Sequence, residues 1–206
     1  GTTVIVDVTN TATANLTVDL ATDGTEDELT IELDRVGATD NIGTINVDDA
    51  ETLNIIVGDD DDVAGVGTLT IATLDLDTVT GTVENSDVTT LNFSGDADVR
   101  VTAFDNPAVA TITTFDASGM TGALGSAALG SFQGPSTAVG GATFTFGTGG
   151  TDFTMGAVVG TLTGGDTVNL GSGDDTIRYT AAAQSTGLTS DTIMNFTQGS
   201  DVIDLI

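Results

Sequence analysis

The chain has 206 residues, of which 31 are acidic and three are arginine, with no lysine, and its formal net charge is −28. This balance argues against nucleic acids and anionic membrane surfaces as partners, because both would repel the protein. The absence of cysteine excludes disulfides and thiolate metal sites. The absence of histidine removes the commonest general base and transition-metal ligand, and no apolar run approaches the roughly 20 residues of a membrane span.

A short pattern recurs along the whole chain, up to Val168-Asn169-Leu170: an apolar residue, then Thr or Asn, then another apolar residue. Examples are Leu29-Thr30-Ile31, Leu53-Asn54-Ile55 and Leu91-Asn92-Phe93. Such alternation predicts short strands with one buried face, and no window has a sustained helical period. Near-identical tripeptides favour a solenoid, in which each coil adds equivalent side chains to one stack. We therefore predict an all-β parallel β-helix (solenoid), irregular over residues 1–120, where a sandwich is the alternative.

Acidic turns separate these strands. The longest acidic run follows Gly58 and supplies four candidate calcium ligands, although charge runs are usually solvated loops: Asp59, Asp60, Asp61 and Asp62. The pairs Asp48-Asp49 and Asp96/Asp98 are better explained as turn residues. Phenylalanines along the chain are expected in the core rather than at a binding surface: Phe93, Phe104, Phe115, Phe144 and Phe153. Thr-x-Thr pairs recur only irregularly, so a ranked threonine array of the ice-binding kind is not expected.

A Gly/Ala-rich connection spans residues 121–141 and divides the irregular part from a tighter part, residues 142–206. A loop of this length is unusual in a compact domain, so the connection is expected to contain a short helix or to form one wide coil. In the tighter part, steps of nine residues separate Phe144 from Phe153 and Val168 from Ile177.

The most informative stretch is residues 161–178, which fits the nonapeptide G-G-x-G-x-D-x-U-x of the calcium-binding β-roll, where U is a large apolar residue. Two copies place a glycine, an aspartate and an apolar residue at equivalent positions: Gly164, Asp166 and Val168, then Gly171, Gly173, Asp175 and Ile177. The first copy lacks the leading Gly-Gly. A short β-roll-like section with few sites is therefore predicted near the C-terminus.

The chemistry of these residues points to Ca²⁺. Glycine allows the tight turn, and glycine carbonyls with aspartate carboxylates supply the hard oxygen ligands that calcium prefers. Two carboxylates about 5 Å apart in a partly buried setting repel by roughly 3 kcal/mol, and a divalent cation would reverse that cost. The candidate metal ligands here are Gly164, Asp166, Gly171, Gly173, Asp174, Asp175 and Asp191; Asp174 has the alternative of facing water.

This stretch resembles the RTX repeats of proteins exported by type I secretion. The tail from Asp191 to Leu205 is similar to the D-x-I-x-[DN]-F-x-x-G-x-D-x-I-D-L segment that follows such repeats. Residues 89–98 and 113–119 resemble sequence segments that recur in RTX-type crystalline surface-layer proteins. The resemblance implies a secreted, calcium-dependent protein at the outer cell surface.

The predicted function is structural: a self-assembling surface layer whose partners are copies of the chain, with cell-surface polysaccharide a further candidate. The alternatives are a segment of a large RTX adhesin that binds a surface or glycan, and the secretion tail of an RTX hydrolase. No catalytic site is predicted, because a serine nucleophile would lack its usual base. The chain is expected to be a fragment or processed product of a larger protein.

Overall fold

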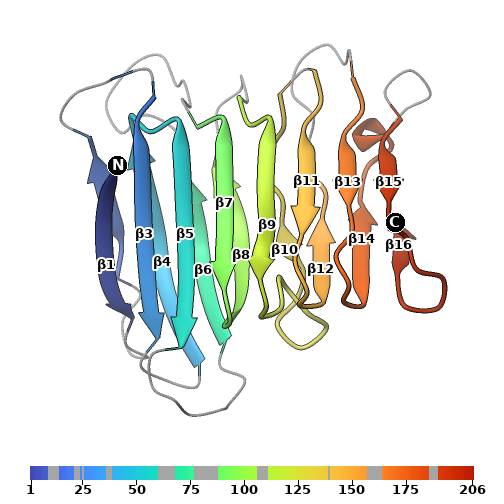
Figure 1. Cartoon of the computed structure of the whole chain (residues 1–206), viewed down its shortest axis with the longest axis horizontal. Coiled ribbons are helices and arrows are strands. Elements are labelled where there is room, and N and C mark those ends of the chain that lie inside the picture. Colours follow the sequence, from blue (N-terminus) through green and yellow to red (C-terminus); the bar gives the residue numbers. More distant parts are fainter. Residues whose placement is uncertain are drawn as a thin grey trace.

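The computed structural model describes residues 1–8, 14–20, 24, 26–35, 39–59, 68–76, 88–105, 111–138, 140–156, 164–185 and 190–206. These residues form one parallel β-solenoid, with β1 at one end and β15 and β16 at the other (Figure 1). All pairings between the named strands are parallel. The predicted all-β solenoid is confirmed, also for the irregular part in which a sandwich was the alternative.

One face of the solenoid is an eight-stranded sheet, which contains every odd-numbered strand in chain order. Its strands are β1 (Thr2–Val8), β3 (Glu28–Arg35), β5 (Thr52–Asp59), β7 (Thr90–Gly95), β9 (Thr114–Met120), β11 (Thr143–Phe146), β13 (Thr167–Asn169) and β15 (Thr192–Met194).

The even-numbered strands form the opposite face as two four-stranded sheets. The first contains β2 (Leu16–Asp19), β4 (Thr39–Asp48), β6 (Thr68–Asp75) and β8 (Asp98–Asp105). The second contains β10 (Phe132–Gln133), β12 (Thr151–Thr154), β14 (Asp175–Tyr179) and β16 (Val202–Leu205). Leu124 joins the two sheets, because it forms parallel bridges to Val99 and to Thr151.

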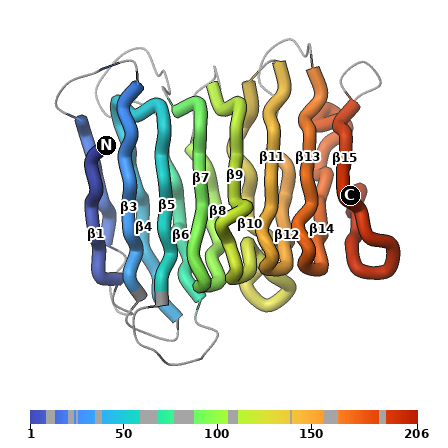
Figure 2. Tube along the Cα trace, viewed as in Figure 1, coloured from blue at the N-terminus to red at the C-terminus, as the bar shows by residue number. Residues whose placement is uncertain are grey.

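The register gives the length of each coil. Glu28 pairs with Thr52, Thr90 with Thr114, and Thr143 with Thr167, each 24 positions apart. Longer coils also occur: Thr52 pairs with Thr90, 38 positions later. The nine-residue steps seen in the sequence lead from one sheet to the other, from Phe144 in β11 to Phe153 in β12 and from Val168 in β13 to Ile177 in β14. They are therefore half-coils (Figure 2).

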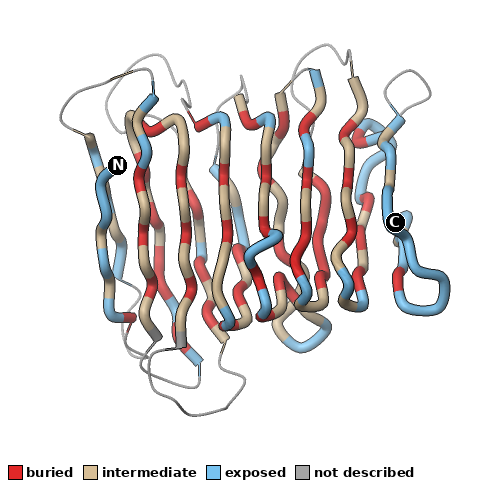
Figure 3. Tube along the Cα trace, viewed as in Figure 1, coloured by how far each residue is buried: buried red, intermediate tan, exposed pale blue. Residues whose placement is uncertain are grey.

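The core lies between the two faces, and it follows directly from the alternating pattern. Buried and outward-facing residues alternate along the strands (Figure 3). Aliphatic residues such as Leu29 and Leu53 fill the N-terminal coils, and a phenylalanine cluster fills the middle ones. Ring centroids in that cluster lie 5.3 Å apart for Phe115 and Phe153 and 5.6 Å apart for Phe132 and Phe153. Four of the five phenylalanines assigned to the core are buried, and Phe104 packs against it.

Helical structure among the described residues is limited to one turn of 3-10 helix, η1 (Ala182–Gln184). None of these residues belongs to a helix long and apolar enough to cross a membrane. The described part of the connection contains Leu124 and β10 and forms one wide coil, because Thr114 pairs with Thr143, 29 positions later. The boundaries 1–120, 121–141 and 142–206 remain predictions.

Candidate metal centre

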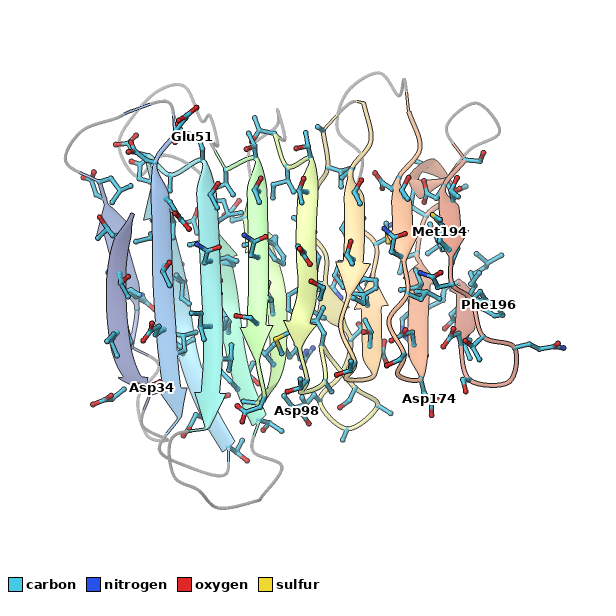
Figure 4. All side chains as sticks on the ribbon, in the orientation of Figure 1. Asp34, Glu51, Asp98, Asp174, Met194 and Phe196 are labelled. Carbon is cyan, nitrogen blue, oxygen red and sulfur yellow. The ribbon has the colours of Figure 1, made fainter. Side chains whose placement is uncertain are left out.

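Turns connect the two faces along two edges of the solenoid. The odd strands begin at the upper edge of Figure 1, and the even strands begin at the lower edge. Figure 4 shows Glu51 at the upper edge, and Asp98 and Asp174 at the lower edge. Acidic residues therefore flank the sheets at both edges, while the core between them is apolar.

The two nonapeptide aspartates lie at opposite edges. Asp166 directly precedes β13 at the upper edge, whereas Asp175 opens β14 at the lower edge. Each faces the aspartate one coil further along: Asp191 for the first and Asp201 for the second. The residues that the motif makes equivalent thus belong to two separate stacks.

At the upper edge, the carboxylates form a ladder with backbone N–H groups of the preceding coil. The Ala142 N–H donates to Asp166 Oδ1 at 2.7 Å, and the Asp166 N–H donates to Asp191 Oδ1 at 2.8 Å. The second oxygen of Asp191 accepts a hydrogen bond from the Tyr179 hydroxyl at 2.8 Å. In an N-terminal coil, Glu51 accepts from the Asp27 N–H at 2.6 Å in the same way.

These hydrogen bonds do not remove the electrostatic cost of ionising Asp166, the most buried carboxylate of the ladder. Burial raises the pKa of Asp166 from 3.8 to about 6, although the Ala142 N–H acts in the other direction, and the negative charge of Asp191 adds to the rise. Burial also raises the pKa of Asp191, which the Asp166 N–H and the Tyr179 hydroxyl partly offset. Both shifts mean that the folded protein resists the ionised form here.

At the lower edge, Asp175 is 0% exposed. Within the described part of the chain, neither of its carboxylate oxygens accepts a hydrogen bond of normal geometry, although Thr151 and the Gly171 N–H are near enough to favour the charged form. Burial raises its pKa, Thr151 of the preceding coil partly offsets the effect, and the charge of Asp201 adds to it. The oxygens of Asp201 are occupied differently: Oδ1 accepts from the Asp175 N–H at 3.2 Å, and Oδ2 accepts from the Thr197 N–H at 2.7 Å.

Glycine is required in the lower turns because successive turns stack backbone on backbone. A Cβ at Gly171 would overlap the carbonyl oxygen of Gly147, and a Cβ at Gly173 would lie 2.7 Å from the carbonyl oxygen of Gly149. Any side chain at these positions would push the turns apart. The stacked turns therefore bring carbonyl oxygens close to the following coil, beside Asp175, which opens β14, and Asp201, which directly precedes β16.

This donor set fits calcium. A fully buried carboxylate whose two oxygens lack hydrogen bonds of normal geometry is a costly arrangement, and the groups around it are oxygen donors of the hard type. At the lower edge, Asp175 and Asp201 with the carbonyls of Gly171 and Gly173 would hold the ion. At the upper edge, Asp166 and Asp191 with the Gly164 carbonyl form the corresponding set.

The remaining predicted ligands lie elsewhere. Asp174 is exposed at the lower edge (Figure 4), in agreement with its alternative of facing water. Asp59 ends β5 and pairs with Arg35 in the register. Asp60, Asp61 and Asp62 lie outside the described residues.

Sequence reasoning left two acidic features out of the predicted set. Asp201 is not among the predicted ligands, although it occupies the aspartate position one coil after Asp175. Asp19, Asp48 and Asp49 form a group whose carboxylate oxygens lie within 4.8 Å of one another. Strands β2 and β4 end side by side here, and Asp19 is exposed, so solvation explains this group without an ion.

Arg178 belongs to the outer face of β14 rather than to either edge. Its guanidinium binds Asp152 through Nε at 2.7 Å and NH2 at 2.9 Å, and Asp204 through NH1 at 2.5 Å. Arg178 therefore pairs with carboxylates of both neighbouring coils. It links β12, β14 and β16 independently of the turns.

Comparison with known proteins gives one match. A family model described as Peptidase M10 serralysin C terminal matches residues 37–206. No curated protein and no solved structure matches the chain. The family is the non-catalytic C-terminal part of serralysin-type proteins and is the RTX-type calcium-binding repeat region. Since the match covers most of the solenoid, including both edges of its C-terminal coils, the chain belongs to the serralysin C-terminal family of RTX-type repeats.

Proposed function

We propose that this chain is a calcium-stabilised structural solenoid of an exported protein, which assembles with copies of itself in a surface layer. The observation that carries the calcium dependence is Asp175, a carboxylate that is fully buried and lacks hydrogen bonds of normal geometry within the described residues. A bound cation would supply the missing partner and remove the repulsion from Asp201.

Calcium would act through folding. Metal binding to a site that exists only in the folded state adds its free energy to folding. With a net charge of −28, the chain repels itself when its carboxylates are ionised. Low calcium before export would weaken the fold and favour the expanded chain, and high external calcium would favour the folded one. The RTX domains of this family come from type I secreted proteins, which supports such an order of events.

The surface-layer role rests on two features of the sequence. The first is that residues 89–98 and 113–119 resemble sequence segments that recur in RTX-type surface-layer proteins. The second is that the chain has neither lysine nor histidine for a catalytic or sugar-binding site. A regular solenoid can also pack with its neighbours through repeated equivalent surfaces. Cell-surface polysaccharide is a second candidate partner of the layer.

The family match equally supports a second function, in which the solenoid is the secretion tail of an exported hydrolase. In that case, the calcium-loaded chain folds but stays monomeric, and the longer protein carries a catalytic domain. The adhesin alternative predicts a monomer that binds a surface or glycan.

A calcium titration followed by circular dichroism, light scattering and electron microscopy separates these functions, with magnesium as the control ion. The surface-layer function requires cooperative folding with calcium, followed by ordered sheets or tubes. Folding without assembly favours the secretion tail. An Asp166→Ala/Asp175→Ala double variant should need more calcium to fold. An unchanged calcium midpoint in that variant would contradict the site assignment.

A further inference from the structure

The outer face of the odd sheet carries two regular columns of polar side chains. The first column consists of the residues that begin successive strands: Thr52, Thr90, Thr114, Thr143 and Thr167. The second lies two residues further along the same strands: Asn54, Asn92, Asp116, Thr145 and Asn169. Thr192 extends the first column into β15. We call these two columns the Thr/Asn array.

These side chains point outward, because the residues between them in each strand are buried in the core: Leu53, Leu91, Phe115, Phe144 and Val168. The members of the array are exposed or half-buried. Thr-x-Thr pairs are irregular, as expected, but the register aligns one column of threonines that the sequence did not reveal. The spacing along the chain varies between 24 and 38 residues, and only the register aligns the threonines.

Hydrogen bonds to a second array residue and to Glu28 of the neighbouring strand β3 hold some of the array side chains in place. Asn92 Nδ2 donates to Asn54 Oδ1 at 2.8 Å, and Asn54 Nδ2 donates to Glu28 Oε1 at 2.8 Å. Threonine is stiff at χ1 because it is β-branched. The array therefore presents its polar groups with less conformational entropy left to lose on binding than free surface side chains would.

The array is also unusual in its charge. Asp116 is its single acidic member, although the chain has 31 acidic residues. The outer face of the even strands is different: Thr39, Thr68 and Asp98 share one row, and Asn41, Thr70 and Arg100 share another. From β5 to β13, the odd sheet therefore combines regular spacing with a single acidic residue in these two columns. The array ends at β3, where the acidic Glu28 is aligned with Thr52.

We propose that the Thr/Asn array binds the surface of ice crystals. Neighbouring strands lie about 4.8 Å apart, a spacing close to the shortest lattice repeat of hexagonal ice. Each threonine hydroxyl donates one hydrogen bond and accepts others, and each asparagine amide does both. A flat array with this repeat can fix a row of water molecules at each strand and match them to the lattice.

An ordered water lattice fits this face better than a second protein copy does. The array offers no aromatic or large aliphatic anchor, and protein interfaces depend on such anchors for affinity. Because the array is nearly uncharged, it lacks the ionic groups that would otherwise disturb the lattice water. The inference requires only the folded solenoid and is independent of assembly into a layer.

Ice-affinity partitioning in calcium-containing buffer tests the proposal: an ice front grows slowly through the solution, and the protein fraction in the ice is measured. The test variant is Thr114→Tyr at the centre of the array. The matched control is Thr73→Tyr in β6 on the opposite face, where Thr73 lies between Thr44 and Ala103. We expect the wild type and the control to be enriched in ice and Thr114→Tyr to lose that enrichment.

Thermal unfolding in the same buffer checks that each variant is folded, and Thr143→Tyr, at an exposed array position, replaces Thr114→Tyr if that variant unfolds. A wild type no more enriched than an inert acidic protein of similar size would overturn the proposal. So would enrichment of the folded array variants equal to that of the wild type. Concentration-dependent association that the array substitutions abolish, without ice enrichment of the wild type, would assign the face to a second copy.

Discussion

The two edges of the C-terminal coils place buried aspartates in different surroundings. At the upper edge, Asp166 and Asp191 accept hydrogen bonds from backbone N–H groups of neighbouring coils. At the lower edge, Asp175 is equally buried, but neither of its oxygens accepts a hydrogen bond of normal geometry within the described residues. The upper aspartates thus receive part of their stabilisation from the protein itself.

The difference predicts which edge would depend more on a bound cation. A carboxylate that accepts backbone hydrogen bonds keeps part of its stabilisation when the ion leaves. A buried carboxylate without hydrogen bonds of normal geometry keeps more of the cost of desolvation. Loss of calcium should therefore affect the turns around Asp175 and Asp201 more than those around Asp166 and Asp191.

The largest expected effect comes from the stacked turns of the lower edge. Gly171→Ala places a methyl group against the carbonyl oxygen of Gly147, so the turns must separate. We expect a loss of about 3 kcal/mol in the free energy of unfolding, measured by denaturant titration in calcium. Gly140→Ala at the upper edge is the control, because its Cβ would meet open space. Equal stability of the two variants would contradict the stacking.

Replacing Asp175 should have opposite effects in the two metal states. Asp175→Asn removes a ligand and should destabilise the calcium-loaded protein by about 2 kcal/mol. In chelator, the same change removes a buried unpaired charge and should raise stability. Thermal unfolding with calcium and with chelator measures both. Asp174→Asn should change neither, because Asp174 is exposed, and a stability loss for Asp175→Asn in both states would count against a cation at this edge.

The upper edge should make the metal-free protein sensitive to pH. The pKa of Asp166 is about 6 in the folded protein and 3.8 ordinarily, so between these values the folded state holds a proton that the unfolded state has lost. The stability from this proton is present below pH 3.8 and is lost as the pH rises through 6. Calcium binding should strengthen over the same range, because it requires the carboxylate.

Denaturant titrations in chelator at several pH values measure this slope. Asp166→Asn cannot titrate at this position and should flatten it. A chelated protein whose stability rises between pH 4 and pH 6 would show that Asp166 is not held in the protonated form.

The smallest effect is expected away from both edges. Arg178→Gln removes the ion pairs with Asp152 and Asp204. Because the arginine side chain is 30% exposed, the loss should be about 1 kcal/mol or less. It should be equal with calcium and with chelator, as measured by thermal unfolding. An effect confined to one metal state would mean that this pair is coupled to the turns.

The repeating tripeptide was sufficient to predict the solenoid, because alternation fixes which side chains face the core. The middle residues Asn54, Asn92 and Asn169 do lie in one column. The nonapeptide likewise identified Asp166 and Asp175. The sequence could not show which aspartates meet, because that depends on the length of a whole coil.

Only half of each C-terminal coil has a visible nine-residue step; the other half is longer and has no motif. Asp201 was therefore not predicted as a metal ligand, although it lies one coil after Asp175. In the other coils, the variable coil length hid the Thr/Asn array and the proximity of Asp19 to Asp48. The strand register decides which residues become neighbours in successive coils. The register in turn depends on loops whose lengths vary along the chain.

Hydrogen–deuterium exchange with calcium and with chelator tests the central claim most directly. We predict that chelator removes amide protection first in β14 and β16 and the turns before them, and next in β13 and β15. Strands β3 and β5, which pack an aliphatic core, should keep most of their protection. Identical protection of residues 164–206 in both conditions would contradict the claim that a cation holds these coils together.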